Sequence, residues 1–302
     1  MDLATLLKLY LPLLGWGLFG WLLSWVVPKW APRILGLGLF WVGVPLVIFN
    51  FLRRADLTGP VWLAGVVAMV AVTWGLCLGG GWLVWGRQGF SRQAQGSFLL
   101  TATMGNTGYL GFPVILALAP QYFGWAVLYD VVGTVWGNFG GAVLASYHGQ
   151  GRVVWNRLLR DVGFNPVLWA FALTYLTRSW PAPLAVMAFI DPVAHAIILL
   201  TLVLLGLRLG GMTDGRPLSQ ILPALGIKMF LVPLGVALGC LWLGWQGGML
   251  EVVVLQAGMP SAFSTLLLSE AYGLDQELTA VIIALGTLVV MATLPLWLWW
   301  LN

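Results

Sequence analysis

The sequence predicts an all-α integral membrane protein with ten transmembrane helices. Of its 302 residues, 60% are hydrophobic and 8% are charged, whereas a soluble domain carries about 25% charged residues. The 19 tryptophans point the same way, because large amphipathic rings concentrate where lipid meets water. A chain of this composition lacks the polar residues for a water-exposed surface, so we expect a lipid bilayer to surround it.

The chain divides into ten apolar segments wherever Gly, Pro or charged residues interrupt it. A spanning helix needs about 20 mostly apolar residues. The first segment is too long for the apolar region of a cleaved signal peptide, so we interpret it as a transmembrane helix. The predicted spans are 4–27, 33–52, 60–86, 95–119, 121–147, 164–180, 183–209, 218–245, 249–272 and 276–301.

The distribution of basic residues predicts the orientation. Ten spans place both termini on one side of the membrane, together with Lys8, Arg53, Arg54 and Arg178. Positively charged loops stay in the cytoplasm, so we expect both termini to be extracytoplasmic in the plasma (inner) membrane. Thinly spread basic residues give no reason to expect a nucleic-acid partner. The opposite, more basic side holds Lys29, Arg33, Arg87, Arg92, Arg152, Arg157, Arg160, Arg208 and Arg216.

The longest polar connection, 148–163, splits the chain into two five-helix halves. The first repeat is predicted at 1–147 and the second at 164–302, with a cytoplasmic loop between them. An odd number of spans in each half inserts the second half upside down, which is the inverted-repeat arrangement of many transporters. We therefore expect the functional site to lie between the halves.

The fourth and ninth segments contain helix-breaking motifs. Their positions match, because the ninth segment of the chain is the fourth segment of the second half. They read GNTGYLGFP at 105–113 and QAGMPSAFST at 256–265. Inside a helix, Gly costs about 1 kcal/mol and Pro about 3 kcal/mol relative to Ala. Such paired interruptions point to a transporter binding site. We expect two discontinuous helices that cross at the bilayer midplane.

A broken helix offers unpaired N–H groups and partial positive charge, which suit a carboxylate. Pro113 and Pro260 are expected near the first turns of the half-helices, where a missing N–H costs little. The alternative is that Gly and Pro only allow kinks and close packing. The predicted substrate-binding residues are Asn106, Thr107, Gly108, Gly111, Pro113, Gly258, Pro260, Ser261 and Ser264.

Polar residues inside the spans are candidates for ion coupling. Asp130 and Lys228 lie deep in spans five and eight, and ionisable groups there mark pathways or pair with each other. We expect them to approach one another and Asp130 to take up protons, although a static ion pair is the alternative. Oxygens of Gln256 and Thr265 suit sodium. Asn138 is interpreted as a polar packing contact between helices.

No metal or cofactor site is predicted. Asp191 and His195 share a helix face but have no third ligand nearby, so we expect only a local hydrogen bond. An intramembrane enzyme would need a catalytic set, and with His148 and His195 as the only histidines we find none. A channel is the remaining alternative, because a broken helix can also line a pore.

These motifs resemble the auxin efflux carrier family, which includes bacterial malate-permease-like proteins and plant PIN carriers. The resemblance rests on GNTGYLGFP, on the Asn165-Pro166 pair and on LQAGMPSAFSTLLLSEAYGLDQEL at 255–278, and it extends to Pro295. It implies transport of carboxylates and an Asn at position 106 beside the crossing. The short middle loop departs from the plant carriers, so regulation through a long phosphorylated loop is not expected.

The same resemblance implies a fold similar to the bile-acid symporter and the NhaA antiporter. Helices at 60–147 and 218–302 would form a mobile core that moves like an elevator. Helices at 4–52 and 164–209 would form a scaffold that often dimerises. The expected function is secondary transport of a small organic anion, with symport of another small solute coupled to sodium or protons as the alternative.

Overall fold

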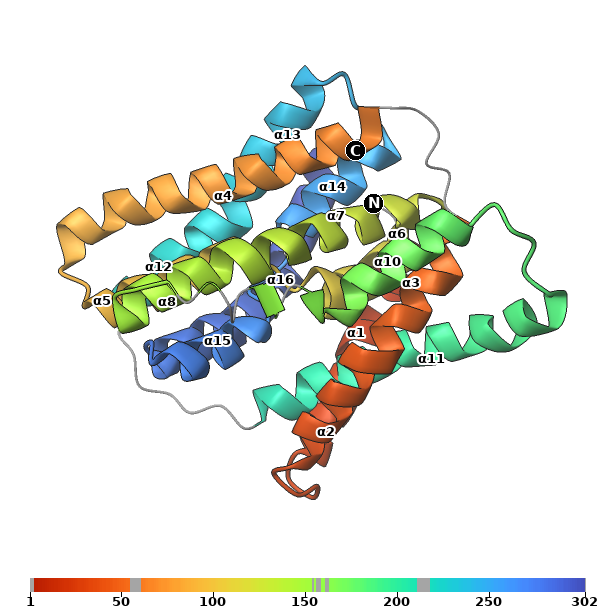
Figure 1. The fold of residues 1–302 in the computed structure, drawn as a ribbon, viewed down its shortest axis with the longest axis horizontal. Helices are drawn as coiled ribbons and strands as arrows, with labels where there is room; N and C mark the ends of the chain where they lie inside the picture. Colours follow the sequence, from red (N-terminus) through yellow and green to blue (C-terminus); the bar gives the residue numbers. More distant parts are fainter. Residues whose placement is uncertain are drawn as a thin grey trace. The chain divides into compact units, whose positions relative to one another are not determined.

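The computed structural model of the protein is mainly helical in the residues that it describes, namely 3–54, 61–153, 155, 159–160, 163–210 and 218–301 (Figure 1). Within them, six helices are long and apolar enough to cross a membrane. A multi-pass integral membrane protein is thus confirmed, while the count of ten spans and their inverted relation stay predictions. The six are Ala31–Leu52, Leu63–Val84, Pro120–Gln150, Leu184–Leu209, Leu218–Trp242 and Gln276–Leu301.

The chain forms two compact units. Unit 1 comprises Met1–Thr58, Gly108–Val131 and Asn165–Gly211. Unit 2 comprises Gly59–Thr107, Val132–Phe164 and Met212–Asn302. Each unit therefore combines segments that are far apart in the sequence.

Unit 1 is organised around the close packing of helix α1 (Leu3–Leu23) on α11 (Leu184–Leu209). A Cβ atom added at Gly20 would lie 2.1 Å from the Val203 carbonyl oxygen, and one added at Gly206 would lie 1.9 Å from the Gly17 carbonyl oxygen. Small residues let membrane helices approach backbone to backbone in this way. The unit also contains α2 (Ala31–Gly38), η1 (Leu39–Gly43), α3 (Val44–Leu52), α6 (Phe112–Leu118) and α10 (Pro166–Thr177).

A polar cluster ties α3 to α11 within unit 1. The Asp191 carboxylate accepts hydrogen bonds from Asn50 Nδ2 at 2.9 Å and from Arg54 at 2.8 Å. His195 Nδ1 lies 2.8 Å from the backbone oxygen of Asp191, so the local hydrogen bond predicted for this pair is confirmed. The Asp191 side chain thus serves helix packing.

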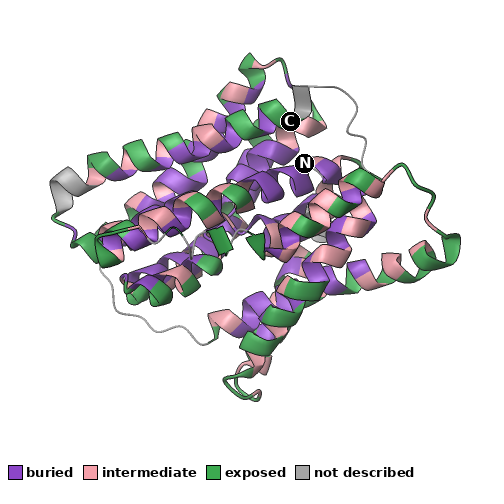
Figure 2. Ribbon diagram, viewed as in Figure 1, coloured by how far each residue is buried: buried purple, intermediate pink, exposed green. Residues whose placement is uncertain are grey.

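In unit 2, the second part of α14 (Gly248–Ala257) lies in the interior, since Val252 to Ala257 are all buried (Figure 2). Helix α4 (Val61–Gln88) packs against α13 (Val232–Trp242). Trp297 Nε1 donates to the Met229 carbonyl at 2.9 Å, fixing the last helix to η5. The other elements are α5 (Arg92–Thr103), η4 (Gly137–Gly141), α8 (Ala142–Gln150), α12 (Leu218–Gly226), η5 (Ile227–Leu231), α15 (Ser264–Tyr272) and α16 (Gln276–Leu301), while α7 (Phe123–Trp136) passes from unit 1 to unit 2.

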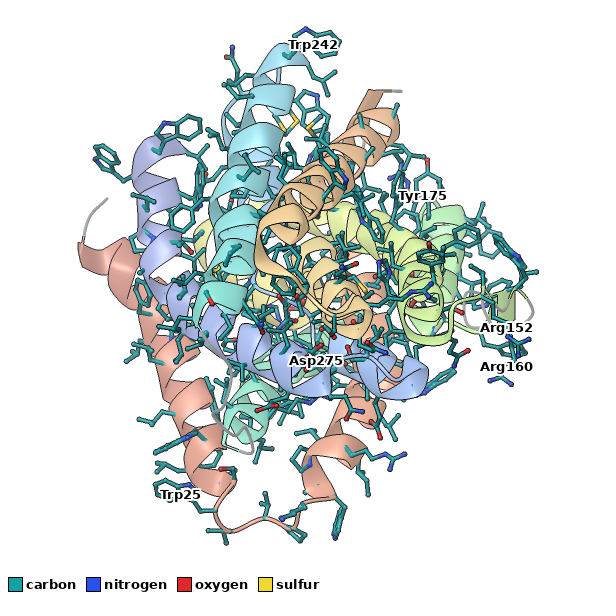
Figure 3. The ribbon with its side chains drawn as sticks, turned by 90° about the vertical axis from the view of Figure 1, so that its left-hand side faces the viewer. Trp25, Arg152, Arg160, Tyr175, Trp242 and Asp275 are labelled. Carbon is teal, nitrogen blue, oxygen red and sulfur yellow. The ribbon has the colours of Figure 1, made fainter. Side chains whose placement is uncertain are left out.

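Large apolar side chains cover the outside of both units. Trp25 is 67% exposed and Trp242 is 85% exposed, and Figure 3 shows Trp242 projecting from the end of α13. A soluble protein seldom exposes so much apolar surface, but lipid accommodates it.

The connection between the predicted halves begins later than expected. Helix α8 continues to Gln150, past the predicted span end at 147, and stops at Gly151 with φ +75°, a left-handed conformation that favours glycine. Arg152 and Arg160 are exposed and point outward (Figure 3). Residues 154, 156–158 and 161–162 of the predicted loop lie outside the described residues.

Candidate functional site

The fourth predicted span is interrupted, as the sequence indicated. Helix α5 ends at Thr103, and helical structure resumes only at Thr107, where η2 (Thr107–Gly111) leads into α6. Met104 has an extended backbone with φ −96° and ψ 108°. Pro113 occupies the first turn of α6, so the prediction for this proline is confirmed.

The ninth predicted span is interrupted as well. Helix α14 ends at Ala257, and α15 begins at Ser264. Gly258 caps α14 by donating its N–H to the Val254 carbonyl at 3.0 Å. Pro260 lies inside the break and not in the first turn of α15, so that expectation was wrong. The physical reason is that the carbonyl group of Pro260 is needed for pairing with the other break.

The two interruptions pair with each other inside unit 2. Gly105 and Ser261 form an antiparallel bridge. The Asn106 N–H donates to the Pro260 carbonyl at 2.7 Å, and the Ala262 N–H donates to the Met104 carbonyl at 2.8 Å. Backbone groups freed inside a membrane must be satisfied within the protein or by water, and here each break satisfies part of the other.

A serine side chain strengthens this pairing. Ser261 is 1% exposed, and its hydroxyl donates to the Thr101 carbonyl in the last turn of α5 at 2.7 Å. The Thr101 carbonyl belongs to the four at a helix C-terminus that lack a partner within the helix. Ser261 thus fixes the second break to the helix that ends at the first.

A buried amine lies beside the paired breaks. Lys228 in η5 is 3% exposed. A Cβ atom added at Gly105 would lie 3.1 Å from Lys228 Nζ and 3.6 Å from the Met259 carbonyl oxygen. Glycine at 105 therefore leaves the space that the lysine amine uses, and the amine lies at the crossing.

Asn106 has an unused donor at the same place. Its side chain is 4% exposed, and its Nδ2 atom has no hydrogen-bond partner among the described residues. A buried polar group without a partner costs about 1–3 kcal/mol. Such a group in a folded protein calls for an explanation, and a ligand that accepts a hydrogen bond supplies one.

Three further predicted residues lie on α14 and α15 in unit 2. Gln256 and Thr265 are fully buried, whereas Ser264 is exposed at the start of α15. The Thr265 hydroxyl donates to the Ala262 carbonyl at 2.7 Å, which leaves its oxygen as an acceptor. The structure thus brings Asn106, Pro260, Ser261 and Lys228 together, with the other three on the adjoining helices of the second break.

Asp130 lies in unit 1, where it faces the start of the half-helix after the first break. It is 6% exposed, and a Cβ atom added at Gly108 would lie 3.3 Å from Asp130 Oδ1. The Thr201 hydroxyl holds the next residue by donating to the Tyr109 carbonyl at 2.9 Å. The pairing predicted between Asp130 and Lys228 stays a prediction.

Sequence reasoning gave Arg208 no role beyond marking the more basic, cytoplasmic side at the end of the predicted span 183–209. In the structure it lies in the last turn of α11, partly buried in unit 1. Its guanidinium fills the space beside Gly36. The sequence did contain a signal. Arg208 directly follows an uninterrupted apolar run, so the same helix is expected to continue as far as this residue.

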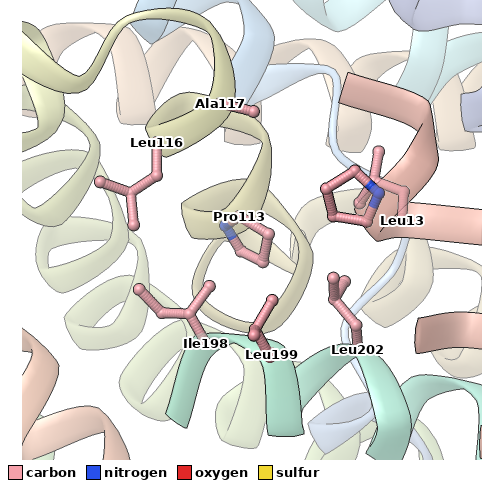
Figure 4. Close-up of a pocket in the computed structure, with 8 residues that line it drawn as sticks. Leu13, Pro113, Leu116, Ala117, Ile198, Leu199 and Leu202 are labelled. Atoms are coloured by element: carbon pink, nitrogen blue, oxygen red, sulfur yellow. The ribbon is translucent and has the colours of Figure 1, made fainter. Parts of the chain in front are cut away.

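A cavity of about 350 Å³ in unit 1 is not the anion site. It lies between α1, α6 and α11 and has only aliphatic and proline side chains (Figure 4). Of the predicted substrate-binding residues it includes Pro113. A carboxylate placed there would lose its hydration without gaining a hydrogen-bond partner. The lining residues are Pro12, Leu13, Pro113, Leu116, Ala117, Ile198, Leu199 and Leu202.

We predict that Ser261→Ala lowers the stability of the protein by about 1 kcal/mol, the usual net value of a buried hydrogen bond. The measurement is the midpoint of thermal unfolding in detergent. Ser264→Ala, three positions along at an exposed site, is the matched control and should leave the midpoint unchanged. Equal midpoints for the two variants would show that the Ser261 hydroxyl does not hold the breaks together.

Comparison with known proteins supports a transport role. Residues 151–298 match the family of membrane transport proteins. An uncharacterized transporter of Methanothermobacter thermautotrophicus is 28% identical over 260 residues, covering 85% of this chain and 84% of its own. An uncharacterized transporter of Methanocaldococcus jannaschii is 24% identical over 216 residues, 68% of each chain. The resemblance predicted from the sequence motifs is confirmed: residues 151–298 are similar to the membrane transport proteins of the auxin efflux carrier family.

Proposed function

We propose that the protein is a secondary transporter of a small organic anion, such as a carboxylate, which binds at the paired breaks of unit 2. The observation that carries the proposal is the unpartnered Nδ2 of buried Asn106, whose chain neighbour Gly105 lies against the buried amine of Lys228. An amide N–H donates only to an acceptor. Positive charge next to it favours an acceptor that is negatively charged.

The helix that follows Asn106 supports the same choice of ligand. The five residues of η2 and the seven of α6 run on without a gap from Thr107 to Leu118. The N–H groups of a first turn have no partner within the helix, and the helix dipole adds partial positive charge there. A carboxylate beside Asn106 would meet this charge as well as the amine.

The wider mechanism draws on the family resemblance. In this proposal ten spans form two inverted repeats at 1–147 and 164–302, and a core at 60–147 and 218–302 carries the solute by an elevator motion. The scaffold at 4–52 and 164–209 forms a homodimer in the plasma membrane, with both termini outside the cytoplasm. The solute crosses chemically unchanged.

Coupling to protons would use Asp130. Its carboxylate faces Gly108 at the start of the half-helix within unit 1, and ionisable groups inside a membrane often mark proton pathways. Asp130 would take up and release a proton during the transport cycle. The alternative, sodium coupling, would use the oxygens of Gln256 and Thr265, since sodium is a hard cation that prefers oxygen ligands.

We predict that the purified protein is stabilised thermally by malate, another dicarboxylate or an aromatic acid, because a ligand that binds only the folded state raises its apparent stability. In proteoliposomes the stabilising anion should show counterflow. Asn106→Leu should weaken binding about 10-fold or more by removing a hydrogen bond to a charged group. Asn165→Ser keeps the helix cap at Asn165, whose Oδ1 accepts from the Val167 N–H, and should bind normally.

Two results would contradict this function. One is that no carboxylate of the panel stabilises the protein thermally, whereas sodium alone does. This result would favour a cation-coupled carrier of another solute. The other is conductance without counterflow, which indicates a channel.

We predict that Asp130→Asn abolishes the pH dependence of anion uptake, because an amide side chain does not change its protonation state in the physiological pH range. The measurement is initial uptake into proteoliposomes between pH 5.5 and pH 8. Asp275→Asn is the control, since Asp275 Oδ1 accepts from the Leu278 N–H and the amide oxygen of Asn can do the same. An unchanged pH profile for Asp130→Asn would rule out its coupling role.

A further inference from the structure

A second amide in unit 2 has an unused donor. Asn138 lies in η4 (Gly137–Gly141), a π-helical turn between α7 and α8. Its Nδ2 atom is buried and has no hydrogen-bond partner among the described residues. A polar contact between helices, which the sequence suggested for Asn138, requires such a partner. The amide is therefore not explained by packing.

Three glycines bring this turn close to its neighbours. A Cβ atom added at Gly137 or Gly141 would lie 2.9 Å from the Met104 side chain, and one added at Gly140 would lie 2.7 Å from Trp74. Real Cβ atoms do not approach other atoms so closely, so larger residues would push the turn away. The turn consequently packs directly against residue 104, whose carbonyl pairs with Ala262 at the crossing.

Helical spacing places Asn138 on the face that looks toward α5 and α15. Ala142 and Ala145 follow it by four and seven residues, the spacing of one helix face. Both are buried in a cluster with Leu100 of α5 and Tyr272 of α15. Asn138 extends this face by one turn toward Met104, that is, toward the paired breaks.

We propose that Asn138 Nδ2 is a second hydrogen-bond donor of the anion site and acts together with Asn106 Nδ2. This inference rests on the proposed function. The turn that carries Asn138 packs on the Met104 side chain, two residues before Asn106 in the chain, and a carboxylate has two oxygens that accept hydrogen bonds. π-helical turns occur frequently at functional sites, and here the turn carries the donor. Two donor groups also disfavour a metal cation as the ligand, because neither N–H can coordinate a metal.

The test compares Asn138→Leu with wild type in a thermal-shift titration with sodium malate, sodium succinate and sodium phenylacetate. Sodium chloride at equal sodium concentration is the baseline. We expect the ligand-free midpoint to stay the same or rise, because an unpartnered polar group has been removed. The apparent Kd of the stabilising carboxylate should rise about 10- to 100-fold, the equivalent of one hydrogen bond to a charged group.

Two more variants complete the design. Asn138→Asp replaces a donor with a negative charge and should abolish carboxylate binding, whereas Asn138→Gln keeps an amide donor and should retain part of it. Phe139→Leu changes an exposed neighbour in the same turn and should bind like wild type.

The outcomes separate this inference from the proposed function. If a carboxylate stabilises wild type, and Asn106→Leu weakens it but Asn138→Leu does not, the role of Asn138 is refuted while the anion site stands. A lowered ligand-free midpoint for Asn138→Leu with an unchanged Kd would assign Asn138 to packing. If none of the three carboxylates stabilises wild type, both proposals fail.

Discussion

The antiparallel pairing of Met104–Asn106 with Pro260–Ala262 is the constraint on which the rest of unit 2 depends. A helix interrupted inside a membrane leaves N–H and C=O groups that lipid cannot satisfy. Two interruptions placed against each other satisfy part of that need through the bonds from Asn106 to Pro260 and from Ala262 to Met104. The remaining groups and the side chains around them then become available to a solute.

The surroundings of the crossing follow from this pairing. Gly105 leaves room for the Lys228 amine, and Gly137 and Gly141 leave room for the Met104 side chain. Ser261 anchors the second break to α5 through the Thr101 carbonyl. The Lys228 amine thus lies at the crossing, and the amides of Asn106 and Asn138 each have an Nδ2 donor without a partner among the described residues.

Local composition was enough to predict where the helices break. The penalties of Gly and Pro act within a few residues of their position, so 105–113 and 256–265 could be identified directly. The partner of each backbone group could not, because it lies about 155 residues away in the chain. Pro260 illustrates the limit: propensity placed it in a first helical turn, whereas the tertiary pairing uses its carbonyl in an extended segment.

Side-chain roles were harder to predict than helix breaks for the same reason. Asn106 drew attention because it lies inside a break, but Asn138 looked like an ordinary polar residue in an apolar helix. Its unpartnered donor became visible only when its neighbours were known. Arg208 was expected only to mark the cytoplasmic side at the end of a span, yet its guanidinium packs against Gly36 inside unit 1.

The most direct measurement is an experimental structure of the protein with a bromine-substituted carboxylate, located by anomalous scattering. We expect residues 104–106 and 260–262 to be paired through their backbones, with the carboxylate within hydrogen-bond distance of Asn106 Nδ2. Continuous helices through both segments would show that the breaks do not form a site, and a carboxylate bound only away from Asn106 would show that the anion binds elsewhere.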